Sequence, residues 1–141
     1  MQTMSLTTME IGDMIEINRG QYKHWALYIG NGEVIQMVIP DVFSAVLSAF
    51  SSSSSSLSTK GMITIDTLED VASMDTYTIK NYLDNKYTPR PTDVIMGEVD
   101  KMRGRTLKYD LLGNNCEHFV TFLRYGKSKS QQADDFLKNL C

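Results

Sequence analysis

The chain has 141 residues, a formal net charge of −3 and 42% hydrophobic residues, a size and composition typical of one globular domain with a modest core. The negative charge argues against a general nucleic-acid binder. No run of 18 apolar residues predicts a transmembrane helix, and the first residues do not predict a signal peptide. Two cysteines, of which Cys141 is the last residue, predict neither a disulfide framework nor a prenylation box, so we expect a cytoplasmic protein.

Alternating or continuous apolar segments predict a small antiparallel sheet. These segments are residues 12–18, 24–29, 33–39, 61–66 and 107–111. Ile15 and Ile17 share one face of the first segment. Asn31-Gly32 lies between the second and third segments, and this dipeptide is a strong signal for a β-hairpin. After a polar lead-in over residues 1–10, the first half of the chain therefore predicts a strand followed by a hairpin.

Other segments have helical spacing. Residues 91–102 predict a helix with Pro91 in its first turn. Its expected core-facing residues are Val94, Ile95, Val99 and Met102. A helical turn is expected over residues 68–72, an extended or mixed segment over 77–87, and a polar, weakly amphipathic tail over 127–141.

The segment 41–62 is expected to be a variable loop that includes a serine run over residues 51–56. Its apolar side chains lie at helical spacing, which fits either packing on the core or contact with a membrane interface. These side chains are Phe43, Val46, Leu47 and Phe50.

The stretch 113–126 predicts a loop that leads into a short helix with Cys116 at its start. Asn114 or Asn115 is the candidate N-cap, and Gly126 is the candidate stop. A helix N-terminus stabilises negative charge, so we expect a thiol more acidic than a free one, whose pKa is about 8.5. This is a favourable place for a nucleophile. The alternative is a small buried residue that starts a core helix.

Only two histidines are present, so the choice of a base for Cys116 is binary. His118 is two residues from the cysteine, and residues at that spacing on a helix do not face each other. We expect His118 to brace the helix against the body of the fold. His24 begins an apolar strand far upstream and is the candidate general base.

The hairpin turn decides the role of Gln36. A two-residue loop at Asn31-Gly32 places Gln36 on the strand face opposite His24. A three-residue loop pairs Ala26 with Gln36, so that Gln36 and His24 become diagonal neighbours on one face. We favour the second register, in which the Gln36 amide orients the histidine ring like the third member of a catalytic triad.

The predicted elements make an α+β domain over residues 1–126, in which the histidine precedes the cysteine along the chain. Two sequence motifs resemble those of the lecithin:retinol acyltransferase family. They are His-Trp-Ala-Leu-Tyr-Ile-Gly-Asn-Gly at 24–32 and Asn-Cys-Glu-His-Phe-Val-Thr-Phe-Leu-Arg-Tyr-Gly at 115–126. That family includes the HRAS-like suppressor phospholipase/acyltransferases. The resemblance extends from about residue 12 to residue 126.

Two branches of the family compete as the nearer match. Segments 39–41, 65–70 and 114–121 look more like the retinol acyltransferase itself. That enzyme and many suppressor-type members carry a hydrophobic anchor, and we expect none within residues 1–141.

The resemblance implies a circularly permuted papain-like fold and acyl transfer from a glycerophospholipid. Cys116 would form an acyl-thioester, with His24 as general base and acid, and with the Cys116 N–H and Tyr22 stabilising the oxyanion. The acyl chain would pass to water, to the amine of phosphatidylethanolamine, to a lysolipid or to an alcohol such as retinol. No metal or cofactor is implied, and the apolar side chains of residues 43–50 are candidates for contact with the membrane surface.

One departure bears on activity. By the motif match, the second histidine of the family's triad is Gln36 here, which cannot carry a proton. One alternative is therefore a non-catalytic interaction or regulatory protein that kept the fold. Another is a permuted papain-like isopeptidase, which also uses a strand histidine and a helix cysteine.

Overall fold

The computed structural model describes residues 8–39, 58–110 and 114–140, and within these ranges it is an α+β domain. The strands are β1 (Met14–Asn18), β2 (Lys23–Gly30), β3 (Glu33–Val38), β4 (Ser58–Thr67), β5 (Tyr77–Ile79) and β6 (Thr106–Asp110). The helices are α2 (Leu68–Ala72), α3 (Thr92–Met102), α4 (Cys116–Tyr125) and α5 (Gln131–Leu140). No helix in the described ranges is long and apolar enough to cross a membrane.

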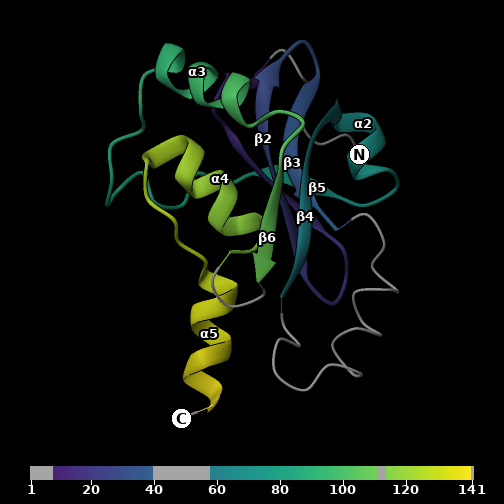
Figure 1. Ribbon diagram of the computed structural model, residues 1–141, viewed down its shortest axis with the longest axis vertical. Helices are drawn as coiled ribbons and strands as arrows, with labels where there is room; N and C mark the ends of the chain where they lie inside the picture. Colours follow the sequence, from purple (N-terminus) through teal and green to yellow (C-terminus); the bar gives the residue numbers. More distant parts are fainter. Residues whose placement is uncertain (1–7, 40–57, 111–113, 141) are drawn as a thin grey trace.

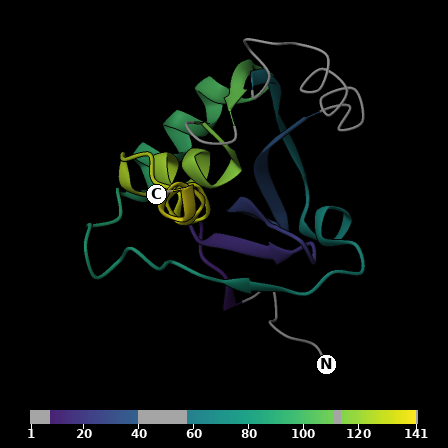
Figure 2. The same ribbon diagram turned by 90° about the horizontal axis from the view of Figure 1, so that it is seen from below.

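The strands form one antiparallel sheet in the order β5-β1-β2-β3-β4-β6 (Figure 1). Helices α3, α4 and α5 lie on one side of this sheet and α2 lies on the other (Figure 2). Figure 1 shows α5 projecting below the body, from the same end of the molecule at which α4 begins. Where the sequence predicted a tail, the structure thus has a helix.

The two faces of the sheet bury separate apolar clusters. The larger cluster joins the sheet to α3 and α4 and includes Trp25, Leu27, Ile35, Val120 and Leu123. The smaller one lies under α2 and includes Ile15 and Ile17, which share a face as predicted. Each fully buried aliphatic side chain contributes about 1.5–3 kcal/mol relative to exposure. The larger cluster therefore fixes α4 against β2 and β3.

The β2–β3 hairpin combines a tight turn with a bulge. Gly30 pairs with Glu33, so Asn31 and Gly32 form a two-residue loop, and both have positive φ (+54° and +78°). The register shifts between Tyr28 and Gly30, where φ of Gly30 is +99°. The bulge supplies the extra residue that the sequence analysis assigned to a three-residue loop.

As a result, Ala26 pairs with Gln36. The favoured register is confirmed, although its cause is the bulge rather than the loop length.

Helix α3 corrects two expectations. Pro91 is the N-cap residue, one position before the helix. Ile95 and Val99 are buried, and Met102 packs against the larger cluster, but Val94 is 42% exposed. At about 100° per residue, Val94 lies about a quarter-turn from the stripe through Ile95, Val99 and Met102. The apolar stripe is therefore narrower than predicted.

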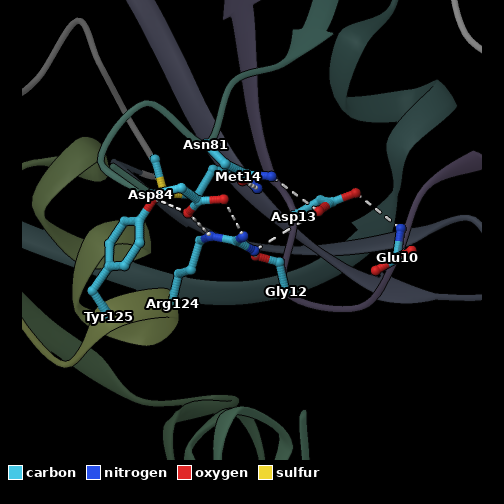
Figure 3. A network of polar contacts seen from close by, with 8 residues as sticks. All are labelled: Glu10, Gly12, Asp13, Met14, Asn81, Asp84, Arg124 and Tyr125. Carbon is cyan, nitrogen blue, oxygen red and sulfur yellow. Dashed lines mark hydrogen bonds and ion pairs between the residues drawn. The ribbon is translucent and has the colours of Figure 1, made fainter. Parts of the chain in front are cut away.

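A buried cation ties the end of α4 to the start of β1 (Figure 3). Arg124 donates to both carboxylate oxygens of Asp84 at 3.0 and 2.9 Å and to the Gly12 carbonyl at 2.8 Å. Asp13 lies 3.8 Å from the same guanidinium, and the Tyr125 hydroxyl donates to Asp84 at 2.7 Å. These contacts join three segments that are far apart in the sequence.

Most remaining expectations lie within the described ranges. The turn at residues 68–72 is helix α2, capped by the Thr67 side chain, and the strand expected at 61–66 begins earlier, at Ser58. The segment 77–87 is mixed, with β5 at its start. The predicted helical spacing at 42–50, the serine run at 51–56 and Cys141 lie outside the described residues.

Candidate active site

Helix α4 begins at Cys116, and its local sequence fixes that start. Asn115 is the N-cap, because its side-chain oxygen accepts the N–H groups of Glu117 and His118 at 2.9 and 3.1 Å. In return, Nδ1 of His118 accepts the Asn115 N–H at 3.0 Å. This is a capping box in which histidine takes the usual place of glutamate or glutamine. His118 thus caps its own helix and is buried. The expectation that it braces the helix against the body of the fold stays a prediction.

The C-terminal end of α4 agrees with the sequence. Gly126 has φ +78° and donates its N–H to the Phe122 carbonyl. This left-handed C-cap suits glycine, which lacks a Cβ.

The sulfur of Cys116 lies beside the first residues of β2, before β2 pairs with β3. The β2–β3 pairing begins at Ala26, and before that point the backbone of β2 meets the start of α4. The thiol lies 3.9 Å from the Lys23 carbonyl oxygen, to which it donates, and the Trp25 N–H also hydrogen-bonds the sulfur. Lys23 and Trp25 flank His24. The candidate nucleophile therefore contacts the backbone on both sides of the candidate base.

The expectation of an acidic thiol is wrong in this structure. Burial, and to a smaller extent the nearby charge of Glu117, raises the pKa of Cys116 to about 11. The N–H groups of Trp25, Cys116 and Glu117 lower it by a smaller amount. The effect of burial exceeds that of the helix N-terminus, because the thiolate loses more stabilisation on leaving water than these N–H donors supply. At neutral pH the sulfur is a thiol.

His24 and Gln36 form a buried pair on neighbouring strands. Their exposed fractions are 8% and 7%, and Nε2 of His24 lies 2.7 Å from Oε1 of Gln36. Burial lowers the pKa of His24, the bond to Gln36 opposes this, and Arg19 lowers the pKa further. The imidazole is thus neutral at neutral pH, with Nε2 engaged by the amide and Nδ1 on the other side of the ring.

Tyr22 is 56% exposed, in the connection before β2. Sequence reasoning missed a second tyrosine, Tyr109 on β6. The Cys116 backbone N–H hydrogen-bonds the Tyr109 oxygen, while burial and the charges of Cys116 and Tyr22 raise the Tyr109 pKa. Tyr109 thus lies beside the cysteine and near Tyr22. Tyr109 belongs to an edge strand that the sequence predicted only as a short apolar segment. No local motif indicates a role for this tyrosine.

The buried carboxylate of Glu117 joins the start of α4 to α5. It is 1% exposed and accepts hydrogen bonds from the Tyr82 hydroxyl, from Ser130 Oγ at 2.9 Å and from the Gln131 N–H at 2.9 Å. Gln132 donates both its backbone N–H and its side-chain amide to the same carboxylate, each at 3.2 Å. Helix α5 therefore begins on an anion, which its N-terminus favours.

Gln132 also reaches the cysteine's surroundings. Its side-chain oxygen accepts the Lys23 N–H at 3.0 Å, next to the carbonyl that meets the thiol. Sequence reasoning missed this arrangement. The signal that could have indicated it is Ser130, which caps α5 by accepting the Ala133 N–H at 3.1 Å. Among the described residues, no three His, Cys, Asp or Glu side chains gather to hold a metal ion.

Comparison with known proteins assigns the chain to a family. Residues 7–129 match the family described as lecithin retinol acyltransferase. The chain belongs to that family. It is 46% identical over 123 residues to phospholipase A and acyltransferase 1 of Rattus norvegicus, a match that covers 87% of this chain and 72% of the relative.

Two human relatives are similar over about the same length. Phospholipase A and acyltransferase 4 of Homo sapiens is 46% identical over 123 residues, which cover 87% of this chain and 74% of the relative. Phospholipase A and acyltransferase 2 of Homo sapiens is 39% identical over 122 residues, which cover 86% and 74%. Cys116, His24, Gln36 and Tyr22 lie inside the family match, whereas α5 lies beyond it.

Proposed function

We propose that this member of the lecithin retinol acyltransferase family is a thiol phospholipid acyltransferase and phospholipase A. It would take a fatty acyl chain from a glycerophospholipid through a Cys116 thioester. The carrying observation is the position of the Cys116 sulfur between the backbones of Lys23 and Trp25, on either side of His24. The printed names of the relatives, each a phospholipase A and acyltransferase, support the same reaction class.

In the proposed first step, Cys116 attacks the ester carbonyl while its proton moves to Nδ1 of His24. Nδ1 is the ring nitrogen left for this task because Nε2 faces Gln36. His24 then returns the proton to the leaving oxygen, which releases a lysophospholipid and leaves the acyl group on sulfur. Because burial keeps both partners neutral, the proton moves as the sulfur attacks, and no thiolate forms beforehand.

In the proposed second step, an acceptor hydroxyl or amine attacks the thioester and loses its proton to His24, and Cys116 leaves and regains a proton. Water as acceptor gives hydrolysis at the first or second ester position. The amine of phosphatidylethanolamine, a lysolipid or an alcohol such as retinol gives acyl transfer. The backbone N–H of Cys116 would stabilise the oxyanion. In the structure this N–H is donated to the Tyr109 oxygen, so the oxyanion would replace Tyr109 as its acceptor. Tyr22 stays a predicted donor to the oxyanion.

The arrangement of His24, Gln36 and Cys116 also supports the interpretation of the α+β fold as a permuted papain-like fold. The base comes from a strand that precedes the nucleophile helix in the chain, with a neutral amide behind the base. Peripheral contact with a membrane surface through Phe43, Val46, Leu47 and Phe50, and a cytoplasmic location, stay predictions.

The non-catalytic alternative rested on Gln36. Its amide is buried against the imidazole rather than turned to solvent, which favours an orienting role. The isopeptidase alternative finds less support, because each of the relatives named above carries a lipid-enzyme name. We therefore retain the acyltransferase as the main proposal.

The deciding experiment is intact-protein mass after incubation with phosphatidylcholine vesicles, with Cys116→Ala as the matched control. We expect the wild type alone to gain the mass of one fatty acyl group, reversible by hydroxylamine. Absence of both an adduct and released fatty acid over a long incubation would refute the proposal. Release of a ubiquitin-type conjugate without any lipid product would favour the isopeptidase.

A further inference from the structure

Behind Gln36, two side chains of β4 hold its amide. The β3–β4 register pairs Gln36 with Thr64, and Asp66 follows two residues later on the same face. Nε2 of Gln36 lies 3.0 Å from Oδ2 of Asp66 and 3.4 Å from Oγ1 of Thr64. The Thr64 hydroxyl donates to the same Asp66 oxygen at 2.7 Å. The pair of His24 and Gln36 therefore continues into a carboxylate.

This arrangement decides which end of the Gln36 amide faces the histidine. The oxygen and nitrogen of an amide have nearly the same shape, so only the surrounding donors and acceptors distinguish them. An ionised carboxylate only accepts hydrogen bonds. The Thr64 proton is directed to Asp66, which leaves the Thr64 oxygen as an acceptor too. Both neighbours thus require the NH2 end of Gln36, and its oxygen must face His24.

The orientation of the amide then selects the histidine tautomer. Since Oε1 of Gln36 only accepts, Nε2 of His24 must carry the proton that it shares at 2.7 Å. In the neutral ring the other nitrogen, Nδ1, is then unprotonated. That is the form a general base requires. A flipped amide would stabilise the opposite tautomer, which has no lone pair to offer at Nδ1.

We propose that Asp66, supported by Thr64, is a positioning residue for acyl transfer that fixes the Gln36 amide and through it the proton on His24. A charged group behind the amide also polarises it toward the imidazolium that forms during the reaction. A neutral glutamine thereby performs the orienting role without carrying a proton. This inference rests on the proposed function for its kinetic part only.

The direct test is the ¹⁵N spectrum of histidine-labelled protein, which distinguishes the two tautomers without any substrate. The chain has only two histidines, and the spectrum of His24→Asn assigns them. We expect His24 to be the Nε2–H tautomer in the wild type. In the double variant with Thr64→Val and Asp66→Ala, which removes both acceptors, we expect a clear Nδ1–H signal.

The kinetic test compares the wild type with single variants of Asp66. We expect Asp66→Ala to lower kcat about 10-fold with little change in KM, because the base is present in the wrong form for part of the time. Asp66→Asn keeps an acceptor oxygen at the same place and should recover part of the loss. Asp100→Ala, at an exposed position of α3, is the charge-matched control and should behave like the wild type.

The proposed acyltransferase activity and the proposed role of Asp66 can be refuted separately. If the wild type forms no thioester, the acyltransferase proposal fails, while the spectra still decide whether Asp66 sets the tautomer. A wild-type tautomer in the double variant overturns the positioning role, whatever its activity. The positioning role is also overturned if the His24 tautomer shifts in Asp66→Ala while the kcat of this variant equals that of the wild type. Thermal unfolding of each variant confirms that the folded proteins are being compared.

Discussion

The Glu117 carboxylate accepts a hydrogen bond of 2.9 Å from Ser130 Oγ, which joins the residue after the cysteine to the start of α5. The carboxylate is 1% exposed and all of its partners are donors. A buried charge is tolerated only when it is satisfied in this way. The helix beyond the family match is therefore attached directly to the candidate active site.

Replacement of Glu117 by glutamine should destabilise the protein. The new NH2 group would face at least one donor, such as the Ser130 hydroxyl or the Gln131 N–H. We expect a loss of about 3 kcal/mol in the free energy of unfolding, measured by urea denaturation. Glu33→Gln, at an exposed position of β3, makes the same chemical change and should alter stability by less than about 0.5 kcal/mol. Equal stabilities for the two variants would contradict the role of Glu117.

Alkylation of Cys116 should report a neutral thiol. Because burial raises its pKa to about 11, the rate with iodoacetamide should keep rising through pH 9 and level off only near 11. The measurement is mass spectrometry in a Cys141→Ser background, which removes the second thiol. A plateau already reached below pH 7 would indicate a preformed thiolate–imidazolium pair and contradict the neutral pair.

The same pKa shift predicts an alkaline loss of stability. The folded state keeps the Cys116 proton to a higher pH than the unfolded chain, whose thiol has a pKa near 9.0. Its contribution is therefore fully present below pH 9 and is lost as pH rises through about 11. The serine in Cys116→Ser does not titrate in this pH range. Between pH 9 and pH 11 the wild type should therefore lose more stability than this variant. Parallel thermal-unfolding curves for the two proteins would count against the shift.

Removal of the Arg124 side chain should uncouple α4 from β1 and the segment at Asp84. Arg124→Ala leaves the Gly12 carbonyl without its donor and leaves Asp84 with the Tyr125 hydroxyl but no cation, and we expect a loss of about 3 kcal/mol by chemical denaturation. Lys80→Ala breaks a half-exposed ion pair of 3.6 Å with Glu16 and should cost under about 1 kcal/mol. If the two variants lose the same amount, the Arg124 contacts are not the brace described here.

Two glycine-to-alanine substitutions should change stability in opposite directions. Gly30 has φ +99°, and its hypothetical Cβ meets only Ile11 atoms at 3.5 Å, so Gly30→Ala should cost about 1–2 kcal/mol through the backbone alone. Gly97, inside α3, has open space around it, and Gly97→Ala should stabilise by about 1 kcal/mol. Urea denaturation measures both. A stabilising Gly30→Ala would contradict the bulge that sets the hairpin register.

Local sequence alone determined the limits of the cysteine helix and the identity of the candidate base. Asn115 and Gly126 act within a few residues of their own positions, so capping rules could find them. The register of Gln36 was one of two options, because it depends on a bulge at Gly30 that the Asn-Gly signal does not specify. The exposure of Val94, by contrast, follows from its position about a quarter-turn from the apolar stripe of α3, which helical geometry specifies.

The acidity of Cys116 and the surroundings of the site were decided only by the tertiary structure. The helix N-terminus acts locally and favours a thiolate, but burial is set by every element packed around the sulfur and reverses the outcome. Tyr109 and Asp66 come from segments whose own sequences show no catalytic pattern, and nothing in the cysteine motif predicts that Glu117 attaches α5. Desolvation and long-range hydrogen bonds depend on which distant segments meet, and the chain folds those segments together only as a whole.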